Sequence, residues 1–151
     1  MQYTVGQMAK RLGVAPSTLR YYDKEGLLPY VESSDGGIRL FKESDYEWLS
    51  VIECLKQSGL SIKEIRQYID LCRQGDGTIP ERMQLFQHRR QAVLQQMAQL
   101  QQTLDMLDYK LWFYQTSQEA GTTAVHKGDT VEDVPEAYRE TFLRARGHGA
   151  R

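Results

Sequence analysis

The residue types best suited to chemistry in this sequence are grouped in one short run, Ser17-Thr18-Leu19-Arg20-Tyr21-Tyr22-Asp23. Arginine can bind a phosphate or the edge of a guanine base, and serine, threonine and tyrosine hydroxyls can donate hydrogen bonds to phosphates. An ordinary solvated helix has a similar composition, so the run alone does not decide the function. Residues 1–31 carry four basic against two acidic residues, a net charge of +2, which supports a DNA contact only weakly.

Two short helices are expected to position this run. Thr4 and Gln7 can form a capping box at the start of a helix that ends at Gly13. Pro16 suits the first turn of a second helix, and Gly26 can end that helix in the left-handed conformation. Two short helices joined by a tight turn predict a helix-turn-helix motif.

The next segment has the pattern of a β-hairpin. Its turn-forming run, residues 32–37, is flanked by the extended runs 29–31 and 38–41. Such a hairpin would form a wing beside the second helix. The predicted DNA contacts are Thr4, Pro16, Ser17, Thr18, Arg20, Tyr21, Tyr22 and Arg39.

Three longer helices are predicted after the wing. Residues 44–58 and 61–74 should form a helical hairpin that covers the first two helices. A long helix should then run from Pro80 to Ser117, after a capping-box pattern of Thr78 and Glu81.

The last thirty or so residues carry a weaker pattern. A short amphipathic helix is predicted for residues 135–146, capped by Asp133 and Glu136. A loosely docked tail and a lid over a binding site both remain open as its role.

The long helix has apolar residues at alternating spacings of four and three. Such a narrow seam needs a second long helix, so we expect two copies of the chain to pair as a coiled coil. Folding of the helix back onto the head as ordinary core is the alternative. The seam consists of Met83, Phe86, Val93, Met97, Leu100, Leu104, Leu107 and Leu111, with Arg90 as its polar member.

Length and charge are compatible with this architecture. A chain of 151 residues can hold one sizeable core or a small domain plus an appendage, and its net charge of −1 does not indicate nucleic acid by itself. No long apolar run or signal-peptide pattern is found, so a cytoplasmic protein is expected. The histidines His88, His126 and His148 have no metal-ligand or nucleophile-base spacing, so we expect no enzyme, cofactor or metal site.

Four motifs in combination resemble the MerR family of transcriptional regulators. They are Tyr3-Thr4-Val5-Gly6-Gln7, Thr18-Leu19-Arg20-Tyr21-Tyr22-Asp23, Gly26-Leu27-Leu28-Pro29 and Arg39-Leu40-Phe41. The resemblance covers residues 2–74 and implies a winged helix-turn-helix head and an antiparallel coiled-coil homodimer. It also implies binding to a promoter dyad, whose overlong spacer is distorted so that RNA polymerase engages both promoter elements. Two positions depart from the family pattern, since Ala15 replaces the usual Ser or Thr cap and Phe41 stands where the wing often has tyrosine.

The effector is less well defined. Metal-sensing members carry cysteines after the long helix, and residues 118–151 contain none, so metal sensing is not expected. Residues 52–61 and 111–114 resemble the thiol-bearing branch typified by AdhR and NmlR, which implies that Cys54 senses aldehydes or other electrophiles. Cys54 lies about 110° from the centre of its apolar stripe at ~100° per residue, whereas Cys72 falls on a stripe. A merely structural Cys54 and a hydrophobic ligand bound non-covalently by Trp112-Phe113-Tyr114 both stay open.

Together these inferences predict a mainly α-helical protein in three parts. Residues 1–75 form a winged helix-turn-helix DNA-binding domain, residues 76–118 a dimerisation helix, and residues 119–151 a C-terminal tail. The expected partners are double-stranded promoter DNA, a second copy of the chain, RNA polymerase and a small electrophile or hydrophobic ligand, with no membrane. A coiled-coil adaptor whose head binds protein is the alternative from another class.

Overall fold

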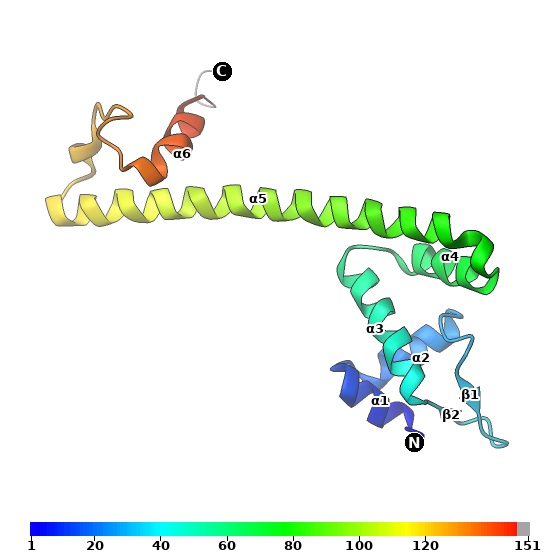
Figure 1. Ribbon diagram of the computed structural model, residues 1–151. Coiled ribbons are helices and arrows are strands. Elements are labelled where there is room, and N and C mark those ends of the chain that lie inside the picture. Colours follow the sequence, from blue (N-terminus) through cyan, green and yellow to red (C-terminus); the bar gives the residue numbers. More distant parts are fainter. Residues whose placement is uncertain (148–151) are drawn as a thin grey trace. The chain divides into compact units, whose positions relative to one another are not determined.

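The computed structural model describes residues 1–147, so His148 lies outside the described residues. The fold is mainly helical with one small β-hairpin, as predicted (Figure 1). The chain divides into two compact units, Met1–Gln91 and the chain from Ala92 onward, and helix α5 contributes to both. Among the described residues, no helix combines the length and apolar character needed to cross a membrane.

The first two helices begin and end where the sequence predicts. Helix α1 (Val5–Leu12) starts at a Thr4–Gln7 capping box, and Gly13 ends it with a φ of 72°. Helix α2 (Pro16–Lys24) has Ala15 at its N-cap and no side-chain hydrogen bond there, in keeping with the absence of the usual cap. Gly26 follows with a φ of 74°, which is the left-handed conformation that glycine adopts readily.

The wing is formed by strands β1 (Glu32–Ser33) and β2 (Arg39–Leu40), which pair antiparallel. The sequence placed the first strand too early, over residues 29–31. Ser34 explains the difference, because its N–H donates to the Ile38 carbonyl at 2.8 Å and so closes the turn later. A bridge between Tyr3 and Phe41 ties the start of the chain to the wing.

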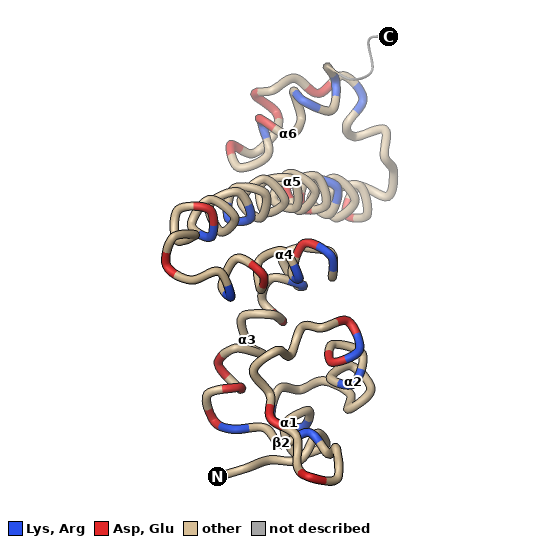
Figure 2. The backbone as a smooth tube through the Cα atoms, turned by 90° about the vertical axis from the view of Figure 1, so that its right-hand side faces the viewer, with Lys and Arg blue, Asp and Glu red and all other residues tan. Residues whose placement is uncertain are grey.

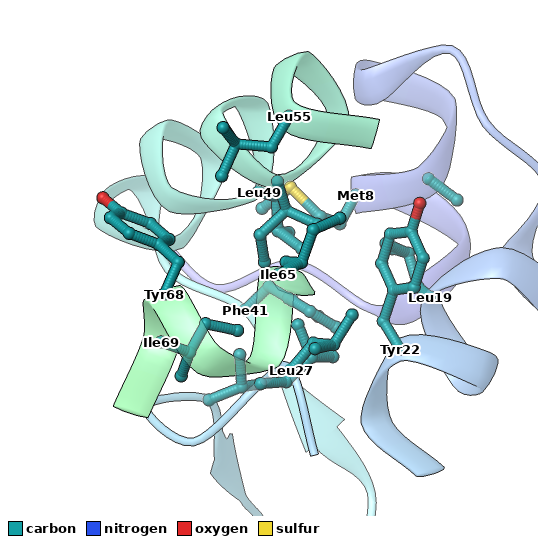
Figure 3. Packing of buried hydrophobic residues seen from close by; sticks show 14 of the residues in the cluster. Met8, Leu19, Tyr22, Leu27, Phe41, Leu49, Leu55, Ile65, Tyr68 and Ile69 are labelled. Atoms are coloured by element: carbon teal, nitrogen blue, oxygen red, sulfur yellow. The ribbon is translucent and has the colours of Figure 1, made fainter. Parts of the chain in front are cut away.

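Helices α3 (Glu43–Gln57) and α4 (Ile62–Arg73) complete the core of the head. Met8 of α1, Leu19 of α2, Phe41 beside the wing, Leu49 of α3 and Ile65 of α4 meet there, each at most 1% exposed (Figure 3). In α3, Leu49 is buried, while Trp48 and Val51 lie at the edge of the core. Leu49 is buried because residues of other elements pack against it, and such contacts between elements cannot be predicted from helix periodicity.

A short 3-10 helix, η1 (Asp76–Thr78), precedes α5 (Ile79–Ala120). Thr78 therefore lies in η1. Its hydroxyl donates to the carbonyl of Leu71 at 2.6 Å, so it contacts the end of α4 instead of forming the predicted capping box with Glu81. The connection between α4 and α5 is held by this contact.

In the second unit, η2 (Thr123–His126) and α6 (Glu136–Gly147) follow α5. A separate apolar cluster joins α6 and the preceding loop to α5, and its buried members are Tyr109, Val134 and Phe142. Asp133 does not cap α6 as predicted. Its Oδ2 accepts from the Thr130 N–H at 2.8 Å and from the Thr130 hydroxyl at 2.7 Å, which lowers the pKa of Asp133.

Candidate nucleic-acid interface

Helix α2 presents one polar face to solvent. Ser17, Arg20 and Tyr21 are exposed, whereas Leu19 and Tyr22 are 1% and 0% exposed. Residues three and four apart lie on the same side of a helix, so the three exposed side chains form a continuous surface. We call Ser17, Arg20 and Tyr21 the α2 face. It can offer two hydroxyls and a guanidinium to a nucleic acid.

Other predicted contacts border this face. Pro16 is exposed at the first turn of α2, and Thr18 is half-buried beside it. Thr4 is exposed at the start of α1, where its Oγ1 accepts from the Gln7 N–H at 3.3 Å. The Thr4 hydroxyl hydrogen can still be donated to a phosphate.

The arginines near the α2 face differ in their partners. Acidic and basic residues are interspersed over the head (Figure 2). Arg11 donates to Glu43 Oε2 at 2.6 Å and pairs with its other oxygen, and this guanidinium, together with the Tyr3 hydroxyl, lowers the pKa of Glu43. Arg20 has no hydrogen bond or ion pair within residues 1–147. Its charge is therefore available to a ligand.

Arg39 has a structural role in the wing. Its Nη2 and Nε donate to the two carboxylate oxygens of Asp23 at 2.6 and 3.0 Å. Its Nη1 donates to the Val31 carbonyl and to Ser33 Oγ at 2.8 and 3.1 Å. These four hydrogen bonds hold the wing against α2. Arg39 thus positions the wing, and its predicted contact with DNA stays a prediction, since 36% of its side chain is exposed.

Tyr22 lies in the core of the head and not on the predicted DNA-binding surface. Its side chain is 0% exposed, its hydroxyl donates to Glu53 of α3, and Lys56 Nζ lies 5.4 Å from its ring centroid. Burial, followed by the Glu53 hydrogen bond, raises the pKa of Tyr22. The side chain thus joins α2 to α3 and has no surface for DNA. The sequence could not show this because Glu53 is 31 positions away.

We expect Tyr22→Phe to destabilise the fold without weakening DNA affinity. The change removes one hydrogen bond to a carboxylate, which contributes about 1.5–3 kcal/mol. Urea unfolding measures the loss, and Tyr21→Phe is the matched control because Tyr21 is 47% exposed. We expect that control within about 0.5 kcal/mol of wild type. Equal stabilities of the two variants would contradict the role assigned to Tyr22.

Comparison with known proteins identifies the architecture. Residues 3–72 match the family described as MerR HTH family regulatory protein, and residues 46–109 match that described as MerR, DNA binding. An HTH-type transcriptional regulator of Haemophilus influenzae is 41% identical over 136 residues, covering 90% of this chain and 98% of the relative. The chain belongs to the MerR family. Members of this family are DNA-binding transcriptional regulators and not enzymes.

Two further MerR proteins are informative. The crystal structure of HiNmlR, a MerR family regulator lacking the sensor domain, bound to promoter DNA, has a TM-score of 0.74 and 42% identity, and covers 83% of this chain and 99% of that chain. AdhR of Bacillus subtilis is 37% identical over 91 residues, which are 60% of this chain and 65% of AdhR. These similarities confirm the predicted AdhR- and NmlR-like branch.

The two thiols of this MerR chain have different surroundings. Cys54 is exposed on α3, and Cys72 is half-buried at the edge of the head core. Arg82 Nη1 lies 4.0 Å from the Cys72 sulfur. Burial and then the hydrogen bond with Cys72 raise the pKa of Tyr68 to about 12. Reagents can reach Cys54 directly, while Cys72 belongs to the packing between α4 and α5.

The predicted dimer seam is exposed along α5. Met97, Leu100, Leu104, Leu107 and Leu111 are 49–70% exposed. The other members vary. Met83 and Phe86 are 56% and 40% exposed, Val93 is half-buried, and the Phe86 ring lies edge-on to Tyr68 at 5.4 Å. A continuous row of exposed apolar residues is typical of a surface that binds another protein.

Trp112 and Phe113 pack within the second unit. Trp112 borders the apolar cluster, and the Phe113 ring stacks on His126 at 4.3 Å. His126 Nδ1 lies 2.8 Å from Asp129 Oδ2, and its Nε2 lies 2.6 Å from Thr116 Oγ1. Sequence spacing did not indicate this histidine–aspartate pair. Within residues 1–147, no three His, Cys, Asp or Glu side chains lie close enough together to hold a metal ion.

Proposed function

We propose that this MerR regulator binds a promoter dyad as a homodimer, with one head on each half-site, and changes the geometry of an overlong spacer when it meets its effector. RNA polymerase would then engage both promoter elements. The observation that carries the proposal is the α2 face, where Arg20 is exposed without a partner among the described residues. The second helix of a helix-turn-helix motif enters the major groove. HiNmlR, which shares this fold, is bound to promoter DNA.

Dimerisation is the second part of the proposal. Residues 1–75 would bind DNA, residues 76–118 would pair antiparallel with a second copy, and residues 119–151 would form the tail. Support comes from the exposed seam and from the second unit, where α6 covers the side of α5 that carries Tyr109. The seam residue Leu104 stays 49% exposed there, so the tail and a partner helix occupy different sides of α5.

Sensing by Cys54 is the third part. Its thiolate sulfur would attack the electrophilic carbon of an aldehyde, forming a C–S bond while the carbonyl π electrons move to oxygen, which takes a proton from water. The exposure of Cys54 supports this assignment, as does the resemblance of residues 52–61 to the thiol-bearing branch of the family. A non-covalent ligand at Trp112 is less favoured, because the apolar cluster of the tail contacts that side chain.

A gel shift with a dyad promoter fragment, run over a salt series, tests the regulator itself. Counterion release makes DNA affinity fall as salt rises, so we expect a specific complex that weakens with a linear logarithmic dependence on salt. Failure to shift the dyad at low salt would refute the proposal and favour a protein-binding adaptor.

We expect Cys54→Ser to fold, dimerise and bind the promoter normally but to lose the response to electrophiles. Cys72→Ser should keep the response and lose about 1 kcal/mol of stability, since the smaller and more polar hydroxyl replaces a sulfur that packs at the edge of the head core. Intact-mass measurement after brief treatment with a limiting aldehyde, alongside in vitro transcription, reads out both effects. First modification at Cys72, or a response that survives Cys54→Ser, contradicts the assignment and redirects attention to the aromatic end of α5.

A further inference from the structure

A small cavity lies in the head beside Arg20, between α1, α2 and the wing. Its volume is about 200 Å³, and its apolar walls are Val5, Leu19, Leu28 and Phe41. Leu19, Leu28 and Phe41 are at most 3% exposed, so these walls are fixed by the core of the head. We call this cavity the wing pocket. Of the α2 face, Arg20 alone lines it.

The rim of the wing pocket carries one uncompensated positive charge. Arg20, Asp23 and Arg39 lie there together with Ile38. Asp23 and Arg39 neutralise each other through their two hydrogen bonds, so Arg20 alone adds net charge. The wing pocket with Arg20 at its rim is therefore complementary to an apolar group that is bonded to one negatively charged group.

Ile38 extends the apolar wall of the pocket towards solvent. It is 63% exposed, although isoleucine is normally buried. Its N–H donates to Ser34 Oγ at 3.2 Å, and its carbonyl accepts from the Ser34 N–H at 2.8 Å. These hydrogen bonds fix the backbone of Ile38 at the rim of the pocket.

We propose that the wing pocket receives one deoxyribose of the DNA backbone, with Arg20 on the adjoining phosphate and Ile38 against the outer side of the sugar. The inference rests on the proposed DNA binding by the head. With α2 in the major groove, the sugar-phosphate backbone that borders the groove lies close to α2, and the wing pocket opens beside α2. A deoxyribose ring joins apolar C–H groups directly to a phosphate, which matches the pocket and its rim.

The volume of the wing pocket favours a sugar over the thymine methyl group, which is the other apolar group that DNA exposes. A water molecule occupies about 30 Å³ in the liquid, and a methyl group is of similar size. With a volume of about 200 Å³, the pocket therefore matches a five-membered ring better than a methyl group. A contact with the sugar is also independent of base sequence.

Substitution of Ile38 in the full-length chain tests the inference. We expect Ile38→Ser to weaken binding roughly fivefold to tenfold per protomer, on dyad and unrelated duplexes alike, because apolar contact area is lost. The salt dependence should stay unchanged, whereas Arg20→Ala should lower its logarithmic slope by about one per protomer. Leu143→Ser is the matched control, since Leu143 is a 57% exposed apolar residue of α6, and its affinity should equal wild type.

Three results would overturn the inference. The first is an unchanged affinity of Ile38→Ser, and the second is a lowered salt slope in that variant. The third comes from replacing thymine by deoxyuridine in the duplex. If wild type then falls to the affinity of Ile38→Ser, the occupant is a thymine methyl and not a sugar. A wild-type chain that fails to shift the dyad would instead refute the proposed function.

Discussion

Leu104→Lys should convert the protein to monomers that no longer bind the dyad. Leu104 lies in the seam of α5 and is 49% exposed. In the proposed dimer the change puts two charges into an apolar interface. Loss of a packed leucine costs about 2 kcal/mol or more, so two copies weaken the dimer by about 4 kcal/mol, or roughly a thousandfold. Sedimentation velocity at low micromolar concentration measures the change.

Leu143→Lys provides the control for this prediction. Leu143 is also apolar and 57% exposed, but it lies on α6 and outside the seam. We expect this variant to stay dimeric and to bind the promoter as wild type does. If Leu104→Lys also sediments as a dimer at low concentration, the seam is not the dimer interface, and the exposed residues of α5 need another explanation.

Arg20→Ala should weaken promoter binding by about 1–3 kcal/mol per protomer, which makes it the most damaging substitution on the α2 face. The side chain is exposed and has no partner among residues 1–147, so its removal should leave the fold intact. Fluorescence anisotropy with a labelled dyad, measured over a salt series, gives both the affinity and the number of phosphate contacts.

Two further variants test whether Arg20 contacts a phosphate and whether its effect is specific to α2. Arg20→Lys keeps the positive charge, so it should restore the salt slope if the contact is to a phosphate. Arg73→Ala removes an arginine from α4 whose side chain is 61% exposed, and should leave specific affinity unchanged. Wild-type affinity in Arg20→Ala would show that α2 does not present the recognition surface.

Local sequence patterns alone determined most of the secondary structure. The capping box at Thr4 and the proline at the start of α2 could be predicted because their hydrogen bonds and sterics involve residues three or four positions apart. The seam of α5 could be predicted for a related reason. Apolar residues at alternating spacings of four and three positions are recognised within one helix, without knowledge of distant residues. The ordered motifs of the head, taken together, also indicate the MerR family.

Only the tertiary structure decided what several polar side chains do. The buried hydrogen bond of Tyr22 and the wing-holding pair of Arg39 were not predicted, because their partners Glu53 and Asp23 lie 31 and 16 positions away. The partner of His126 at Thr116 and the approach of Arg82 to Cys72 likewise depend on how separate segments meet. Periodicity tells which side of a helix is apolar, but not which distant residue faces a polar group. Whether a given arginine or tyrosine is available to a ligand is settled only by packing.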